Sequence, residues 1–314
     1  MIKSKICDLL GIKYPIIQGG MAWVADASLA AAVSNAGGLG IITGACPPEI
    51  VREEIRKCKK MTDKPFGVNI MLQAPEVEKI AQIVVEEGVK ILTTGAGSPA
   101  PFMEMWKAAG IKVMPVVASV ALALRIERMG VDAIIAEGAE SGGHTGEANT
   151  LPLVPQIVDA VSVPVIAAGG IGDGRGMAAA FMLGAEAVQC GTCFLVADEC
   201  TVHEVYKEKV LKAGDNDTIV TGKKLGHPVR TVRTPFSKNF AKMENDPAVT
   251  SEELLAFGAG SLRKAVKDGN LKEGSFMAGE IAGMINEKKS CKEIVENMAN
   301  KCEELLKAAN GRLA

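Results

Sequence analysis

Eight short apolar runs divide the first two thirds of the sequence, and each is followed by a glycine-rich or polar cluster and then by a segment with helical periodicity. The helical segments carry apolar residues at three- and four-residue steps and include 27–37, 47–60, 75–88 and 119–130. Strands that alternate with helices require a parallel sheet, and the count of eight favours a closed TIM-type (β/α)8 barrel over an open sheet. The runs centre on Ile17, Ile41, Val68, Ile91, Val113, Ile134, Ile166 and Val188.

Glycines and polar residues gather directly after the predicted strands. In a parallel barrel the C-terminal ends of the strands surround one mouth, where such folds place their active sites. The sequence therefore predicts a single functional rim. The clusters that would form it are Gln18–Met21, Thr43–Gly44, Asn69, Thr94–Gly97, Ser119, 137–144, 169–174 and Gly191–Thr192.

The strand-helix repeat ends after Thr192, and this change suggests three parts of the chain. Residues 1–197 form the predicted barrel. Residues 198–270, which are more charged and contain short alternating stretches, form a smaller inserted domain that would cover the mouth. Residues 271–314 contain two predicted helices, at 275–289 and 290–310, packing on the barrel; the first is glycine-rich enough to approach a ligand or another backbone closely.

Charge and hydropathy exclude two classes of partner. The 35 basic and 37 acidic residues leave a net charge of −2 without a block of like charge, so nucleic acid is not an expected partner. Lysines and an aspartate interrupt the apolar N-terminus, and no run of about 18 uncharged apolar residues follows. The chain is therefore expected to be cytoplasmic and to have no membrane segment.

The eight cysteines are scattered, as is typical of free thiols in a reducing compartment. Cys190 and Cys193 have the spacing of a redox or zinc motif, but no second pair follows them. We expect them to act as small hydrophobic residues at the end of a buried strand. Three histidines without metal-ligand spacing also predict no metal site.

Two neighbouring loops have the composition of a phosphate site. The segment 167–176 follows the seventh strand and opens a helix, and Gly191 and Thr192 follow the eighth, where Thr192 is expected to expose its hydroxyl. The glycines are out of register with a dinucleotide fingerprint, and a Walker A loop is absent.

A flat ring would lie over the mouth beside Gly19, Gly20, Gly142 and Gly143, with Asn69 at its polar edge. Flavin mononucleotide (FMN) fits this combination, although tight turns alone would also use these glycines.

The stretch "AEGAESGGHTGE" at 136–147 sets His144 among glycines on the predicted rim. Close backbone approach to a ring would let this imidazole face a substrate and exchange a proton with it. Glu137 or Glu140 would orient the imidazole, and the sequence does not distinguish between them. The alternative is a histidine that only caps a turn. His203 and His227 lie outside the barrel repeat and are expected to be structural.

Several segments together resemble the flavin-dependent enoyl-acyl-carrier-protein reductase II family of bacterial fatty acid synthesis. They include "PIIQGGMAWVADASLAAAVSNAGGLGIITGA", "TTGAGSP", "PVIAAGGIGDGRGMAAAFMLGAEAVQCGT" and "MAGEIAGMI". That family is similar to the nitronate monooxygenases, which share the barrel, the glycine-rich start and the Gly-Gly-His loop. The segments "DKPFGVNIML", "IAEGAESGGHTG" and "GHPVRTVRT" favour the reductase.

The resemblance implies FMN as cofactor, NADH or NADPH as reductant and a trans-2-enoyl thioester on acyl carrier protein as substrate. It also implies a homodimer and stimulation by a monovalent cation such as K⁺ or NH₄⁺. His144 matches the catalytic histidine, whereas Cys193 stands where a larger residue such as arginine is common. The cofactor-binding residues implied are Gly20, Met21, Asn69, Glu137, Gly142, Gly143, Gly169, Gly170, Gly191 and Thr192.

Two other functions remain open at this point. A nitronate monooxygenase would use the same ring and histidine, but would oxidise alkyl nitronates with O₂ and take no electrons from a nicotinamide. A non-catalytic flavin-binding protein would need neither an ionisable residue at the ring nor a covering domain.

Overall fold

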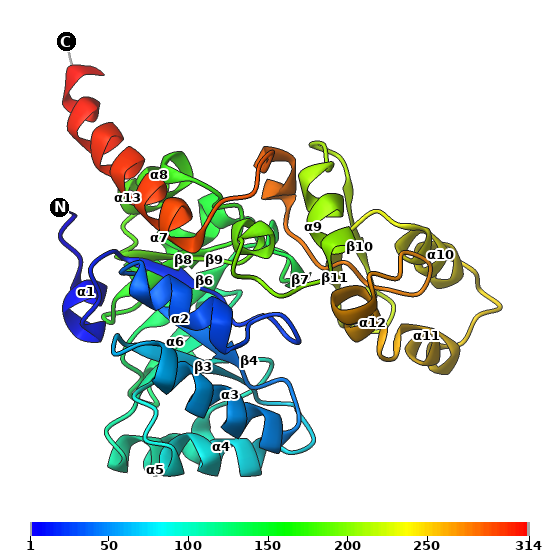
Figure 1. The fold of residues 1–314 in the computed structure, drawn as a ribbon, viewed down its shortest axis with the longest axis horizontal. Coiled ribbons are helices and arrows are strands. Elements are labelled where there is room, and N and C mark those ends of the chain that lie inside the picture. The colour runs from blue at the N-terminus through cyan, green and yellow to red at the C-terminus, as the bar shows by residue number, and fades with distance from the viewer. Residues whose placement is uncertain (1, 313–314) are drawn as a thin grey trace.

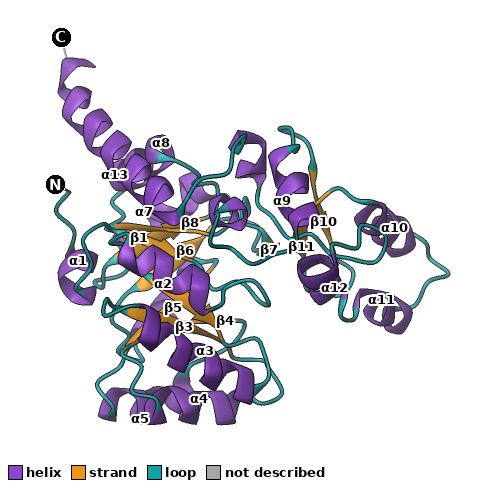
Figure 2. Ribbon diagram, viewed as in Figure 1, coloured by secondary structure: helices purple, strands orange, loops and turns teal. Residues whose placement is uncertain are grey.

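The computed structural model describes residues 2–312, and its centre is a parallel barrel of eight strands. Each of the eight predicted apolar runs forms one of these strands, so the TIM-type barrel is confirmed. Neighbours in the sheet follow the order β1-β9-β8-β6-β5-β4-β3-β2. Figure 2 shows the barrel strands in orange, with helices in purple around them. The bounds of the strands are β1 Ile16–Gln18, β2 Gly40–Thr43, β3 Phe66–Met71, β4 Ile91–Gly95, β5 Lys112–Val117, β6 Ile134–Glu137, β8 Val165–Ala168 and β9 Ala187–Cys190.

Backbone hydrogen bonds between β1 and the start of β2 close the barrel. The Gln18 amide donates to the Leu39 carbonyl and the Leu39 amide donates to the Ile16 carbonyl, both at 2.9 Å. The buried side chain of Gln18 adds a second link, because its Oε1 accepts from the Ile41 amide at 3.1 Å and its Nε2 donates to the Ile41 carbonyl at 3.2 Å. The glutamine thus satisfies its own polar groups inside an apolar barrel.

A layer of helices surrounds the strands, and four of these helices (α2, α6, α8 and α13) begin where a short polar side chain accepts a backbone N–H. Asp26, Ser119 and Asp173 cap their helices in this way directly after a strand or its loop. No helix among the described residues is long and apolar enough to cross a membrane. The layer comprises α2 Ala27–Asn35, α3 Pro48–Met61, α4 Val77–Glu86, η1 Ala100–Phe102, α5 Met103–Ala108, α6 Val120–Glu127, α7 Thr150–Ala160, α8 Gly174–Met182 and α13 Cys291–Ala308, with η4 Ala309–Arg312 after it.

The barrel interior is an apolar core, and the N-terminal helix packs against one end of it. Ile17, Ile41 and Ile135 belong to one buried cluster with Ile6 and Leu10 of α1 (Lys5–Leu10). Figure 1 shows α1 at one end of the barrel and residues 204–268 at the other. Since α1 fills the N-terminal end, the opposite rim is the side from which a ligand can approach the strand ends.

Residues between β9 and α13 include a smaller unit with its own apolar cluster of Phe236, Phe240 and Leu254. The division of the chain at residues 197 and 270 stays a prediction. The unit's antiparallel sheet has the order β10-β11-β7, in which β7 is a segment of the barrel loop that follows β6. Its elements are η2 Thr192–Val196, α9 Glu204–Leu211, β10 Thr218–Thr221, β11 Val229–Val232, α10 Pro235–Glu244, α11 Ser251–Gly258 and α12 Ser261–Asp268, and β7 is Gly143–His144.

The predicted helix at 275–289 is wrong. Phe276 accepts a hydrogen bond from the Val232 amide, Met277 bridges to Thr231, and only η3 (Glu280–Met284) has a short 3-10 turn. Gly279 and Gly283 weaken a helix here, and extended backbone allows pairing with β11 instead. The second predicted helix, at 290–310, is confirmed as α13 and packs between α8 and α2.

The close approach of α2 to β2 generates a stability prediction. A Cβ added at Gly40 would lie 1.9 Å from the carbonyl oxygen of Ala30, which is helix backbone and cannot yield without moving α2. We expect Gly40→Ala to destabilise the protein by about 1–3 kcal/mol. Gly95→Ala, at the end of β4 with open space around the new methyl group, should change stability by less than about 0.5 kcal/mol. Urea unfolding compares them, and equal losses would contradict this account.

Candidate functional site

His144 lies on the barrel rim but is held by the small unit. Within the sheet of that unit, His144 pairs with Val229 and Gly143 pairs with Arg230. The Thr145 amide extends the connection by donating to the Pro228 carbonyl at 3.1 Å. Gly143 has a φ of +80°, a conformation that favours glycine and lets the loop turn into this pairing.

The imidazole of His144 is exposed and has a second histidine beside it. The ring centroids of His144 and His227 are 6.5 Å apart with an angle of 85° between the planes. Partial shielding from solvent lowers the pKa of His144 below its usual value, and the neighbouring His227 acts in the same direction. His227 was expected to be structural, so sequence reasoning missed a histidine that the fold brings to the rim.

Arg230 fastens the loop that carries His144 to the small unit. Its guanidinium donates to the Ala139 carbonyl through Nε and Nη2, at 3.2 and 3.0 Å, and to Thr218 Oγ1 through Nη1 at 3.0 Å. The same Nη1 lies 3.0 Å from a carboxylate oxygen of Glu280, and the arginine side chain is only 13% exposed. One planar cation therefore joins three segments of the site.

Glu137 and Glu140, the two residues predicted to orient His144, have different surroundings, and no protein group among residues 2–312 forms a hydrogen bond with the imidazole of His144. The Glu140 carboxylate accepts from the amide and the hydroxyl of Thr150, both at 2.9 Å, and so holds the start of α7. Burial raises the pKa of Glu137 to about 7, with a smaller opposing effect from the Ser141 hydroxyl. Neither glutamate orients His144 in this structure.

The predicted phosphate loops lie side by side, because β8 and β9 are neighbouring strands. Gly169 and Gly170 have φ values of +88° and +71° and open the backbone after β8. Within the described part of the chain, the amides of Gly169, Gly170, Gly191 and Thr192 donate to no protein acceptor. Adjacent free N–H groups of this kind form an anion-binding cradle.

Thr192 differs from its prediction. Its side chain is buried rather than exposed, because its Oγ1 accepts from the Gly279 amide at 2.9 Å. The same returning segment touches the His144 loop, where a Cβ on Gly142 would lie 2.5 Å from the Ala278 carbonyl carbon. The close approach predicted for the glycine-rich segment therefore exists, although its backbone is extended.

The loop after β1 lies beside the loop after β9, because these strands are paired, and it also contacts the end of β3. A Cβ on Gly20 would overlap the Asn69 side chain, whose Nδ2 lies on that side, while Asn69 Oδ1 accepts from Thr93 at 2.9 Å. Met21 reaches across to Gly191, with its sulfur 3.4 Å from where a Cβ would stand. The structure thus brings Gly20, Met21, Asn69 and Gly191 together at the same rim of the barrel.

The cysteine pair lies behind this rim. Cys190 and Cys193 are buried free thiols, and their mutual hydrogen bond together with burial raises the pKa of Cys190. No set of three or more histidine, cysteine or acidic side chains within residues 2–312 is placed to hold a metal ion.

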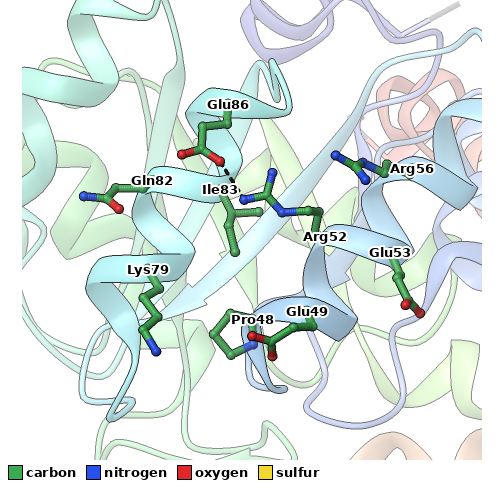
Figure 3. A pocket seen from close by; sticks show the side chains of 9 residues that line it. All are labelled: Pro48, Glu49, Arg52, Glu53, Arg56, Lys79, Gln82, Ile83 and Glu86. Atoms are coloured by element: carbon green, nitrogen blue, oxygen red, sulfur yellow. Dashed lines mark hydrogen bonds and ion pairs between the residues drawn. The ribbon is translucent and has the colours of Figure 1, made fainter.

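A hollow on the flank of the barrel is separate from the mouth. It lies between α3 and α4 and has a volume of about 380 Å³. Arg52 and Glu86, which Figure 3 shows facing each other, form an ion pair of 2.6 Å. Its charged side chains neutralise one another, so it resembles a solvated groove between helices more than a ligand site. The lining residues are Pro48, Glu49, Arg52, Glu53, Arg56, Lys79, Gln82, Ile83 and Glu86.

A parallel barrel with free amides and an exposed imidazole at its mouth has the layout of a barrel enzyme that binds an anionic ligand. The sequence profile of the nitronate monooxygenase family, a family of oxidoreductases, matches residues 3–83 and 75–301, and the chain belongs to this family.

Curated relatives cover almost the whole chain. A Mycobacterium tuberculosis protein named (3aS,4S,5R,7aS)-5-hydroxy-7a-methyl-1-oxo-octahydro-1H-indene-4-carboxyl-CoA dehydrogenase is 35% identical, with 95% of each chain covered. A probable nitronate monooxygenase of Staphylococcus saprophyticus is 31% identical, covering 97% of this chain and 99% of the relative.

Solved structures extend the likeness. FabK from Thermotoga maritima is 50% identical, with a TM-score of 0.97 and all of both chains covered. Nitroalkane oxidase from Streptomyces ansochromogenes is 26% identical, with a TM-score of 0.86 and with 96% of this chain and 99% of that chain covered.

Glu137 provides a pH prediction. Because its pKa rises from 4.5 to about 7 on folding, the folded protein binds more protons between these values and wild-type stability falls as pH rises through this range. Glu137→Gln does not titrate, so its stability relative to wild type should rise over the same range by up to about 3 kcal/mol. Urea midpoints from pH 4.5 to 8 measure this, with exposed Glu147→Gln as the control; parallel curves for Glu137→Gln and wild type would contradict it.

Proposed function

We propose that the protein is an FMN-dependent enoyl-acyl-carrier-protein reductase that uses NADH or NADPH to reduce trans-2-enoyl thioesters. One observation carries the choice of reaction: FabK, an enoyl-acyl-carrier-protein reductase II, is 50% identical over the full length of both chains. The nitronate monooxygenase relatives named above are less similar, at 31% identity. Acyl carrier protein as the carrier, a homodimer and a stimulating monovalent cation belong to the same proposal.

The residues at the mouth fit FMN. The four free amides of Gly169, Gly170, Gly191 and Thr192 would hold its phosphate, and both glycines after β8 have a positive φ that favours glycine. Asn69 would use Nδ2 toward the polar edge of the ring, since its Oδ1 is engaged with Thr93. The ring would be contacted by Gly20, Met21, Gly142 and Gly143. Glu137 is the last residue of β6 and therefore lies at the same rim of the barrel.

When bound, FMN would accept hydride from a reduced nicotinamide and deliver hydride to C3 of the enoyl thioester. The protein's part is to stabilise and protonate the product of the second transfer. Negative charge develops on the thioester oxygen as C3 is attacked, so an N–H of His144 beside that oxygen would stabilise the charge. His144 would then supply the proton at C2, which completes the saturated thioester.

The M. tuberculosis relative is named for a coenzyme A thioester, and this favours thioester chemistry in the family alongside nitronate oxidation. The rigid attachment of His144 to β11 suits a reaction in which the donor must reach two neighbouring atoms of one substrate.

Anaerobic mixing tests the proposal. The purified protein should release FMN when it is denatured. In the absence of O₂, either NADH or NADPH should bleach the flavin absorbance, and crotonyl-CoA should then restore the yellow colour. Rapid turnover of ethylnitronate together with no bleaching by either nicotinamide would favour the monooxygenase. A flavin that neither substrate class affects would instead indicate a binding protein.

The two half-reactions make different demands on His144. Hydride transfer from nicotinamide requires stacking and distance but no acid, whereas reduction of the enoyl thioester requires a donor. We expect His144→Ala to keep FMN and to be reduced by NADH at a near-normal rate, but to be reoxidised by crotonyl-CoA about a hundredfold more slowly. Stopped-flow absorbance measures each step. Equal slowing of both steps would assign His144 to cofactor or nucleotide binding, and unchanged rates would leave it as a loop histidine.

A further inference from the structure

The turn that carries His227 is built to fix its position. The Glu244 carboxylate of α10 accepts from the Gly222 amide at 3.1 Å and from the Lys224 amide at 2.8 Å. The His227 amide donates to the Gly222 carbonyl, at 3.1 Å, and so closes the turn. Pro228 then leads directly into β11. His227 therefore belongs to an ordered turn between two strands rather than to a free surface loop.

The same turn determines where His227 lies relative to His144. Val229, two residues beyond His227, pairs with His144, and the Pro228 carbonyl accepts from Thr145. These backbone links place the two exposed side chains next to each other, and their ring centroids lie 6.5 Å apart in an edge-to-face arrangement. Both side chains reach solvent, so each ring can exchange protons independently of the backbone contacts.

We propose that His227 is a positioning residue of this site, which acts on His144 through the paired arrangement of the two imidazoles: a proton on either ring opposes a proton on the other. The proposal rests on the function proposed above only for its catalytic consequence. Two cations at this separation, in surroundings between water and a protein surface, disfavour double protonation by roughly half a pKa unit to one unit. The direction agrees with the lowered pKa of His144, to which His227 contributes.

Other charged groups on the surrounding elements have their own partners. Arg230 pairs with Glu280, Glu140 binds Thr150, and Glu244 binds the amides of the turn. Lys224 donates through Nζ to the Val249 carbonyl at 2.7 Å, while Lys223 and Glu147 are exposed, so solvent screens their charges. Glu137 is the remaining acid of the loop, and its raised pKa reduces its charge near neutral pH.

The consequence for the reaction is a stronger acid at His144. A lower pKa makes the protonated imidazole a better donor to C2 of the substrate. Without His227, His144 should hold its proton to higher pH, and the alkaline limit of the thioester step should move upward by the same half unit to one unit. The reduction of the protein by NADH should keep its rate at the pH of comparison.

Histidine NMR tests the pairing without turnover, because the chain has three histidines and three sets of imidazole signals. We expect His227→Gln to raise the midpoint of the His144 titration by half a unit to one unit, and His227→Lys, which keeps a positive charge, not to raise it.

His203→Asn is the matched control, because His203 accepts from the Val205 amide at the start of α9 and asparagine can replace that cap. It should leave the His144 midpoint unchanged and identify the His203 signal. An unchanged His144 midpoint in His227→Gln, or an increase in His227→Lys as large as in His227→Gln, would overturn the proposal. A coupled titration in a protein that does not reduce thioesters would retain the pairing and reject only the enzymatic function.

Discussion

The short pairing of β7 with β11 is the contact on which the candidate site depends. Two residues of a barrel loop, Gly143 and His144, become the edge of a sheet that otherwise belongs to residues beyond the barrel. A loop with so many glycines has little intrinsic preference for one conformation. Main-chain hydrogen bonds to β11 give this loop a defined register and so one conformation. The hydrogen bonds of Arg230 to Ala139 strengthen the same attachment.

This arrangement separates two tasks between two parts of the chain. The barrel strands β8 and β9 place free amides at the mouth, where charge on a ligand can be held by rigid backbone. The sheet of the small unit places two imidazoles at the same mouth, where protons can be exchanged. The returning segment 276–280 contacts both, through Gly279 to Thr192 and through Glu280 to Glu140.

Local sequence patterns were sufficient for the barrel, because each strand is a continuous apolar run bounded by turn residues and each helix has its own period. They were also sufficient to bring Gly169, Gly170, Gly191 and His144 to one rim, since strand ends in a parallel barrel converge. Local patterns did not predict the backbone of residues 275–289. The sequence there has a helical spacing of apolar residues, but its first residues pair with β11 instead. Likewise, the position of His227 depends on a strand pairing between residues more than 80 positions apart. The local spacing of apolar residues contains no information about such a pairing.

Helix α13 has a consequence for how the chain is made. It fills the groove between α2 and α8 with Ile294, Val295 and Met298, yet it begins about 100 residues after β9 ends. A nascent chain that has emerged only as far as β9 has every barrel strand, but still exposes the apolar strip that α13 will cover. The helix layer around the barrel is therefore completed only after the small unit has been synthesised. Contacts between residues so far apart in the sequence are slow to form. Between these two moments the chain presents to the cell an apolar surface that the finished protein lacks.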